Sequence, residues 1–459
     1  FETLCLFSGT GLALAVALRV GVGACGDDDG DGAETGPMEM GTTPEMGTTP
    51  EMGTGMETGT DEQPAPLPNI VELAQGAGTF GTLISALQRA GLDDDLAGPG
   101  PFTVFAPPDS AFEGVDLDGL EDDVLLQILQ NHVISGVAAT SDALPARADN
   151  LAELTLLVGD GPTINGVGVA TPDLAASNGV VHVVNEILMP ASIADLAGIA
   201  GLSSLAGALD SAELLDAVSD PAADLTVFAP TNQAFTDAGD VSPDALPGIL
   251  LYHTVSGSVL SGEVPASAPS GSTNEAGNSL TLLFDTTDGV RINDSASVAE
   301  GLADIRATNG VVHVIDSVLL PLSAAGAATA AGLTELLSVV DFAADIETDV
   351  SVADALTGPG TLTVFAPTNA AFEEASGTVE GLSEEQARDV LLYHVAGAIV
   401  LAGDLSDGPV PTLNGGAEVE IVADPPSVNG EGIVATDINV TNGVVHLIDG
   451  VLIPPSLRE

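Results

Sequence analysis

The residues best suited to chemistry are the six histidines, which are all the histidines in this 459-residue chain. They fall into three pairs, His132 with His182, His253 with His313, and His394 with His446. Imidazoles ligate metal ions and transfer protons near neutral pH, so a repeated pair suggests a metal site or an acid–base pair. A zinc site needs three or four ligands, and the two cysteines, Cys5 and Cys25, both precede the first histidine. We therefore favour buried, hydrogen-bonded structural histidines over a metal site.

Common signatures of catalysis are missing from the sequence. It contains no His-Glu-x-x-His zinc motif, no Gly-x-Ser-x-Gly nucleophile motif and no lysine-containing phosphate-binding loop. The sequence therefore predicts a protein that is not an enzyme and that uses no metal and no cofactor.

The stretch Asn-Gly-Val-Val-His leads to the second histidine of each pair, at 178–182, 309–313 and 442–446. These histidines are 131 and 133 residues apart, close to the length of one compact domain, so we interpret the chain as three repeats. Asn-Gly tolerates positive φ and forms tight turns, and the β-branched residues after it favour a strand. Because both alternating sets of side chains are apolar, the strand should be covered on both faces, with the histidine inside a core or at its edge.

Each repeat opens with apolar residues at spacings of three and four, which predicts amphipathic helices. A strand should follow over Thr-Val-Phe-Ala-Pro, at 103–107, 226–230 and 363–367. The proline should end it, because proline has no N–H to donate to a sheet.

After this strand we expect a short helix with an Asx N-cap and a buried phenylalanine. The expected capping residues are Asp109, Asn232 and Asn369. A further helix should then run into the first histidine of each pair. The residue before that histidine is Asn131 in the first repeat, and Tyr252 and Tyr393 in the other two.

These motifs together resemble the fasciclin domain family. The similar text is Thr-Val-Phe-Ala-Pro-Thr-Asn-x-Ala-Phe, then Leu-x-Tyr-His, then Asn-Gly-Val-Val-His-x-Ile-Asp in the second and third repeats. The first repeat has the same order with Pro108-Asp109 in place of Thr-Asn, Asn131 in place of Tyr and Asn185 in place of Asp, so the resemblance covers about residues 68 to 455. The resemblance implies an α+β fold of three tandem fasciclin-like domains, each a β-wedge or sandwich flanked by helices. It also implies a role in extracellular adhesion rather than catalysis.

The resemblance further implies candidate interaction residues, because animal members carry Asp-Ile nine residues before the second histidine, in segments implicated in integrin contact. The corresponding pairs are Asp173 with Leu174, Asp304 with Ile305, and Asp437 with Ile438. An exposed carboxylate beside an apolar side chain could meet a receptor-bound cation. The alternative, which we favour, is that the aspartate forms a turn and the apolar residue anchors the core. The first repeat departs from the family pattern at several positions, so a binding role is least expected there.

The N-terminal region predicts export. Residues 4–18 form an apolar segment typical of a secretory signal, and the text ending at Cys25 resembles the lipobox of bacterial lipoproteins. We expect residues 1–24 to be a lipoprotein-like signal peptide and Cys25 to be lipidated; the alternative is an ordinary cleaved signal. Residues 25–67 are acidic and rich in Met, Thr, Pro and Gly, which predicts a disordered stalk. Its Asp-rich start lacks the last ligand of a calcium loop, so we favour an acidic spacer.

Charge limits the partners. The chain has a formal net charge of −60, with 67 acidic residues and only seven basic ones, all arginine. Such a chain repels phosphate backbones, so nucleic acid is excluded as a partner. We predict fasciclin-like domains at 68–192, 193–323 and 324–456. The protein should be exported and either lipid-anchored in the cell envelope or extracellular, with a lipid anchor as its only contact with the membrane. Its expected partners are extracellular matrix, polysaccharide or cell-surface protein, and the alternative is an envelope small-ligand or calcium-binding protein.

Overall fold

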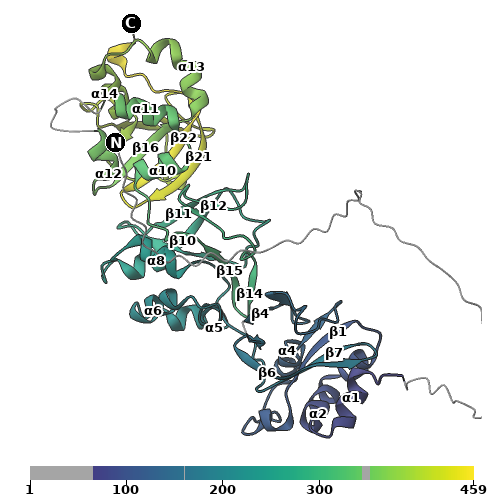
Figure 1. Cartoon of the computed structure of the whole chain (residues 1–459). Helices are drawn as coiled ribbons and strands as arrows, with labels where there is room; N and C mark the ends of the chain where they lie inside the picture. The colour runs from purple at the N-terminus through teal and green to yellow at the C-terminus, as the bar shows by residue number, and fades with distance from the viewer. Residues whose placement is uncertain (1–65, 160, 344–351, 459) are drawn as a thin grey trace, which may run out of the picture. The chain divides into compact units, whose positions relative to one another are not determined.

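The computed structural model describes residues 66–159, 161–343 and 352–458, drawn in colour in Figure 1. The predicted signal peptide, Cys25 and almost all of the predicted stalk lie outside these residues. Within them the chain forms three successive α+β repeats, each with one mixed sheet and its own group of helices.

In the first repeat the sheet has seven strands in the order β2-β1-β7-β6-β5-β4-β3. The helices are α1 (Ile70–Ala77), α2 (Gly81–Ala90), α3 (Asp93–Ala97), the 3₁₀ turn η1 (Asp109–Phe112) and α4 (Asp122–Gln130). The strands are β1 (Phe102–Ala106), β2 (Val133–Ser135), β3 (Arg147–Asp149), β4 (Thr155–Gly159), β5 (Thr163–Ile164), β6 (Val167–Ala176) and β7 (Gly179–Val184).

In the second repeat the sheet has eight strands in the order β13-β12-β11-β10-β9-β8-β15-β14. The helices are α5 (Ile193–Ile199), α6 (Ser203–Ser211), α7 (Leu215–Ser219), α8 (Asn232–Ala238) and α9 (Leu246–Tyr252). The strands are β8 (Leu225–Pro230), β9 (Thr254–Ser256), β10 (Ser267–Thr273), β11 (Ser279–Asp285), β12 (Arg291–Ile292), β13 (Ala296–Ser297), β14 (Ile305–Ala307) and β15 (Gly310–Ile315).

In the third repeat the sheet has seven strands in the order β17-β16-β22-β21-β20-β19-β18, and in Figure 1 helices α10 to α14 lie around β16 and β22. The helices are α10 (Ala324–Ala330), α11 (Thr334–Phe342), α12 (Val352–Thr357), α13 (Asn369–Val379), α14 (Glu384–Tyr393) and the turns η2 (Ala402–Asp404) and η3 (Pro455–Leu457). The strands are β16 (Leu362–Pro367), β17 (Val395–Ala396), β18 (Gly408–Pro411), β19 (Glu418–Ala423), β20 (Pro426–Val428), β21 (Glu431–Val440) and β22 (Gly443–Ile448).

Each sheet contains a parallel strand pair, with one strand between the pair and the nearer edge of the sheet. The strand of the Thr-Val-Phe-Ala-Pro motif pairs with the strand of the Asn-Gly-Val-Val-His motif, as β1 with β7, β8 with β15 and β16 with β22. In each pair the motif phenylalanine lies opposite the histidine, and their rings stack with centroids 5.5, 5.5 and 5.8 Å apart. A parallel pair cannot be closed by a hairpin, so the intervening chain supplies the remaining strands and further helical segments.

The histidine-bearing strand is covered on both faces, as its continuous apolar run predicts. In the second repeat, Val312 and Val314 pack into the cluster formed with helices α5 to α7. Ile315 belongs to a separate cluster on the other side of the sheet, together with Phe228 and Leu282. The core of each repeat therefore has two halves with this strand between them.

The prediction that Asp109, Asn232 and Asn369 cap the short helix after the Thr-Val-Phe-Ala-Pro strand is wrong. The N-caps of α8 and α13 are Thr231 and Thr368, whose hydroxyls accept the N–H of Ala234 and Ala371. In the first repeat proline occupies the threonine position, and the segment forms only the 3₁₀ turn η1. A missing side-chain cap weakens helix formation at this point.

The Asx side chains instead cap the second helix of the same repeat. Their oxygens accept an N–H from its first turn, as Asp109 from Thr82 (2.7 Å), Asn232 from Ser204 (2.9 Å) and Asn369 from Glu335 (3.2 Å). The residues that begin these helices offer no side-chain cap of their own. The Asx residue therefore joins two helices that are separated in sequence.

Substitution of the glycine in an Asn-Gly turn tests the pairing of the two parallel strands. Gly310 has φ +146°, and a Cβ there would lie 1.8 Å from the carbonyl oxygen of Leu225 on β8. We expect Gly310→Ala to lower the free energy of unfolding by at least about 3 kcal/mol, because β8 and β15 must separate. Gly207, an exposed glycine in α6 with open space around its Cα, is the matched control. Gly207→Ala should be neutral or stabilise by up to about 1 kcal/mol in urea unfolding; equal stability of the two variants would contradict the pairing.

Candidate functional site

The second histidine of each repeat is buried and uses both ring nitrogens. Its Nδ1 accepts the backbone N–H of the aspartate nine residues earlier, at 3.2, 3.1 and 3.2 Å in the three repeats. Its Nε2 donates to a loop carbonyl, that of Ala139, Val259 or Val400, at 3.0, 2.9 and 2.8 Å. These roles require the neutral imidazole with its proton on Nε2. Burial lowers the pKa of His313 and His446, which favours that neutral form.

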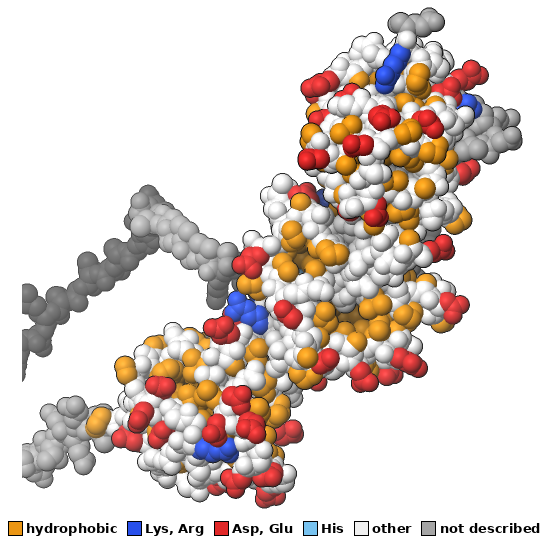
Figure 2. Space-filling view, turned by 180° about the vertical axis from the view of Figure 1, so that it is seen from behind, with side chains coloured by type: hydrophobic (Ala, Val, Ile, Leu, Met, Phe, Trp, Pro, Cys, Tyr) orange, Lys and Arg blue, Asp and Glu red, His pale blue; other side chains and the backbone are white. Residues whose placement is uncertain are grey.

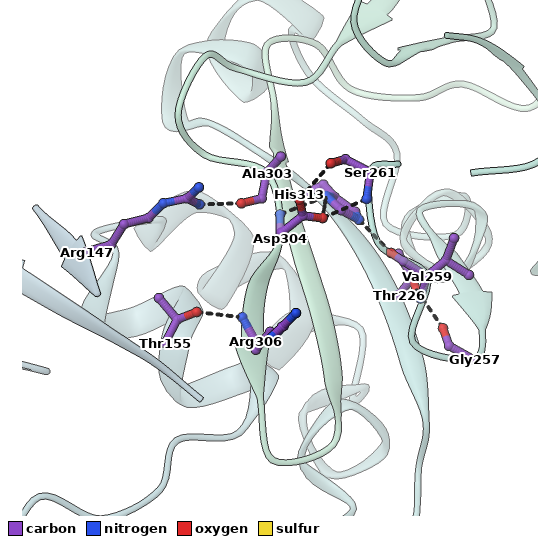
Figure 3. Close-up of polar contacts among 10 residues, drawn as sticks. All are labelled: Arg147, Thr155, Thr226, Gly257, Val259, Ser261, Ala303, Asp304, Arg306 and His313. Atoms are coloured by element: carbon purple, nitrogen blue, oxygen red, sulfur yellow. Dashed lines mark hydrogen bonds and ion pairs between the residues drawn. The ribbon is translucent and has the colours of Figure 1, made fainter. Parts of the chain in front are cut away.

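The carboxylate of the preceding aspartate holds the same loop (Figure 3). Asp173 accepts from the N–H and the hydroxyl of Ser141 at 2.6 and 2.7 Å, and Asp304 accepts both from Ser261 at 2.6 Å. In the third repeat Asp437 accepts only the N–H of Ala402, at 2.8 Å. The three aspartates have positive φ of 64°, 58° and 57°, which short polar side chains tolerate. Each aspartate is therefore both a turn residue and a loop cap.

Hydrogen bonds keep the first two of these carboxylates charged. The hydroxyl and N–H of Ser141 lower the pKa of Asp173. At Asp304 burial acts in the opposite direction, but the bonds from Ser261 outweigh it and the pKa is again lowered. The nearby His313 and Arg147 add smaller effects of the same sign.

The first histidine of each repeat connects a helix end to the last segment of the repeat. In all three, Nδ1 donates to the carbonyl four residues earlier on the helix, at 2.7 to 2.8 Å. Nε2 accepts the N–H of Leu188, Leu319 or Leu452, at 2.8 to 2.9 Å. Burial lowers the pKa of His132, His253 and His394 to about 4. These imidazoles are structural connectors.

The two tyrosines bond to the sheet. Tyr252 donates its hydroxyl to the carbonyl of Thr281 and accepts from Asn293, both at 2.9 Å, and burial raises its pKa to about 12. Tyr393 makes the equivalent bonds with the carbonyl of Glu418 and the amide of Asn429. In the first repeat, Asn131 bonds instead to the carbonyl of Leu188 and to the side chain of Asn150. The first repeat thus replaces one large buried side chain with a small amide network.

A buried threonine at the start of each Thr-Val-Phe-Ala-Pro motif was missed as a functional position. Thr226 donates to the carbonyl of Gly257 at 2.6 Å and accepts the N–H of Val259 at 2.8 Å (Figure 3). Thr103 and Thr363 make the same pair of bonds. The loop that receives the histidine Nε2–H is therefore also held by the neighbouring strand. The recurrence of threonine in all three motifs was the available signal.

The arrangement has structural rather than catalytic chemistry to offer. The two histidines of each repeat share no hydrogen-bond partner, and the second ones are at most 1% exposed. Among the residues that the structure describes, no group of three or more His, Cys, Asp or Glu side chains could hold a metal ion.

Exposure of the Asp-Leu and Asp-Ile pairs differs between the repeats. Ile305 is 2% exposed and Ile438 6% exposed, so neither presents an apolar side chain to solvent. In the first repeat Asp173 is exposed and Leu174 is half-buried. The family pattern favoured the second and third repeats as binding sites, whereas exposure favours the first.

Comparison with known proteins shows the family. The family model described as Fasciclin domain matches residues 78–190, 200–321 and 337–454, one match in each repeat and together most of the chain. The chain therefore belongs to the fasciclin domain family, and its three repeats are fasciclin domains. The predicted resemblance and fold class are confirmed.

Relatives with similar sequences come from animals and bacteria. The chain is 29% identical over 408 residues to "Transforming growth factor-beta-induced protein ig-h3" of Sus scrofa, covering 84% of this chain but only 58% of that protein. It is 37% identical over 131 residues to "Protein sll1483" of Synechocystis, covering 26% of this chain and 73% of that protein. It is 33% identical over 178 residues to "Cell surface glycolipoprotein MPB83" of Mycobacterium bovis, covering 35% and 78%. Within the described residues, no helix has the length and apolar character needed to cross a membrane.

The connector histidines predict acid sensitivity. Each should take up a proton at its ordinary pKa of 6.5 in the unfolded chain but only near pH 4 in the fold. The unfolded state therefore binds more protons in this window, so stability should fall as the pH drops from about 6.5 to about 4, by up to about 1.4 kcal/mol per pH unit for each histidine.

The change of the unfolding free energy with pH is measured by urea unfolding at several pH values in this window. The salt concentration is kept constant and high to screen the acidic surface. His253→Gln keeps a hydrogen-bonding side chain that does not titrate, and should remove about a third of the contribution of the three connector histidines. A free energy of unfolding that stays constant across the window would rule out the buried neutral histidines.

Proposed function

We propose that this chain is an exported adhesion protein that binds through the surfaces of its fasciclin domains. The observation that carries the proposal is that the histidines and the three candidate aspartates of all three domains are engaged in internal hydrogen bonds. Side chains used in this way support a scaffold and leave recognition to the exterior. The related ig-h3 and cell-surface glycolipoprotein sequences support an extracellular setting.

The exterior is strongly acidic, which bears on the partners. Figure 2 shows acidic side chains scattered over the face that it views, with few basic ones. Seven basic residues against 67 acidic ones leave no basic patch for nucleic acid. Matrix proteins, polysaccharides and cell-surface proteins are the partners that we propose, contacted weakly by each domain. Weak contacts on several domains gain avidity when they engage together.

We also propose how the protein is held. Removal of residues 1–24 would make Cys25 the first residue of the mature chain, and a lipid on Cys25 would anchor the chain to the cell envelope. Residues 25–67 would carry the domains away from the membrane. The domain limits 68–192, 193–323 and 324–456 belong to this proposal. The name of the mycobacterial relative, a cell surface glycolipoprotein, supports a lipid anchor.

The alternative function, an envelope small-ligand or calcium-binding protein, has less support. The described residues contain no cluster able to hold a metal ion, so no calcium site can be named among them. Calorimetry with calcium separates the two functions. Stoichiometric heat at micromolar calcium would favour the alternative, because diffuse screening of surface charge gives no stoichiometric heat.

Adhesion is tested with the full chain displayed at controlled density. Attachment of coated beads to matrix or polysaccharide layers should rise steeply with the density of the chain on the bead. The free chain should compete only weakly with the beads, because avidity requires several contacts at once. In cells, Cys25→Ser should move the protein from the membrane fraction to the medium, while a serine substitution at Cys5, which the signal cleavage would remove, should not. Attachment that is independent of density on every surface tried would contradict the proposal.

A further inference from the structure

The same contact joins the first domain to the second and the second to the third. The hydroxyl of Thr155 on β4 accepts the N–H of Arg306, at 3.0 Å (Figure 3). The hydroxyl of Thr281 on β11 accepts the N–H of Asn439, also at 3.0 Å. Arg306 and Asn439 each lie two residues after the aspartate of the Asp-Ile pair. Each contact therefore runs from a threonine of one domain to the Asp-Ile strand of the next.

A leucine two residues after each threonine completes this contact. Leu157 packs against the cluster of the second domain that contains Ile305 and Val314. Leu283 packs against the cluster of the third domain that contains Ile438. We call the strand segments that carry the threonine and the leucine the Thr-x-Leu edge (155–157 and 281–283). We call the surface of the next domain that this edge contacts, around Ile305 or Ile438, the Asp-Ile groove. Ile305 and Ile438, which belong to these clusters, are 2% and 6% exposed.

The first domain has the same groove, and no preceding domain among the described residues covers it. Leu174 and Val183 occupy the positions of Ile305 and Val314, and both are half-buried, whereas those two are each 2% exposed. Ala175, in the position of Arg306, is exposed. The first domain therefore presents an apolar strand edge beside the carboxylate of Asp173.

The third domain lacks the complementary Thr-x-Leu edge. The carbonyl of Glu418 accepts the Tyr393 hydroxyl just as that of Thr281 accepts the Tyr252 hydroxyl, so Glu418 stands at the threonine position. Glu420, two residues on, stands at the leucine position, and both glutamates are exposed. In this contact a carboxylate at 418 would meet the aspartate strand, and one at 420 would enter an apolar groove, which costs free energy.

We propose that the first domain is a docking site for the Thr-x-Leu edge of a strand on a partner protein, and that Glu418 and Glu420 prevent a second copy of this chain from occupying it. The partner's edge presents a threonine hydroxyl and, two residues later, a leucine, with no carboxylate at either position. The two inter-domain contacts within this chain show the geometry that the partner would reproduce. The proposal gives the exposed Asp173-Leu174 pair of the proposed adhesion function a defined kind of partner.

A variant of the chain itself supplies a surrogate partner. Glu418→Thr with Glu420→Leu creates the edge, and Leu174→Asp in the same chain blocks its own groove. We call this triple variant the donor and the chain with an intact groove the acceptor. The donor cannot assemble with itself. Mixed with the unmodified chain at micromolar concentration, the donor should form a one-to-one complex of doubled mass in sedimentation or light scattering. The unmodified chain alone, and the Leu174→Asp chain mixed with it, should remain monomeric. Cooperative thermal unfolding of every variant shows that each is folded.

Two further variants separate the effect of removing the two charges from the effect of creating the Thr-x-Leu edge, and test the contribution of Leu174. Glu418→Gln with Glu420→Gln removes the charges without creating the edge, and should not bind. Leu174→Ala in the acceptor should weaken the donor complex roughly tenfold, in line with the loss of one buried aliphatic contact. Absence of any complex between folded donor and folded acceptor, or a complex unaffected by Leu174→Asp in the acceptor, would overturn the docking site. Because no cell or matrix is involved, either result leaves the bead adhesion experiment as a separate test of the proposed function.

Discussion

The stacked phenylalanine and histidine on the two parallel strands form the interaction on which each domain depends. The ring pair joins the two strands at its core, and the histidine nitrogens then reach outward to the aspartate turn on one side and a loop carbonyl on the other. The same loop is held by the threonine of the neighbouring strand. One buried ring therefore sets the positions of two strands, a turn and a loop, and this explains why the two sequence motifs occur together in every repeat.

Much of this fold could be predicted because its signals are local. The continuous apolar run after Asn-Gly indicates a strand covered on both faces, and the proline after Thr-Val-Phe-Ala lies at the end of its strand in two of the repeats. The helix caps could not be predicted in the same way. Thr231 and Asn232 are both good capping residues, and only the approach of α6 decides that the threonine caps its own helix while the asparagine caps another.

The contacts between domains were beyond sequence reasoning for a different reason. In β4 and β11 the Thr-x-Leu text is an ordinary alternating strand, so its leucine could face solvent or a core. The side chain that covers it belongs to a domain more than a hundred residues away, and no local period reports that contact. Comparing the three repeats makes it visible, because Glu418 and Glu420 replace the pair only where no further domain follows within the described residues.

The Asp-Leu and Asp-Ile pairs show why a motif alone does not define a binding site. All three aspartates make the same turn and accept from the same loop, so the motif is first a structural device. Whether its apolar neighbour can also meet a partner depends on the place of the domain in the chain. Ile305 and Ile438 are 2% and 6% exposed in domains that contact the domain before them, whereas Leu174 is half-buried. The family pattern ranks the first domain last because that domain departs from it at several positions. Accessibility ranks the first domain first, and recognition requires accessible surface.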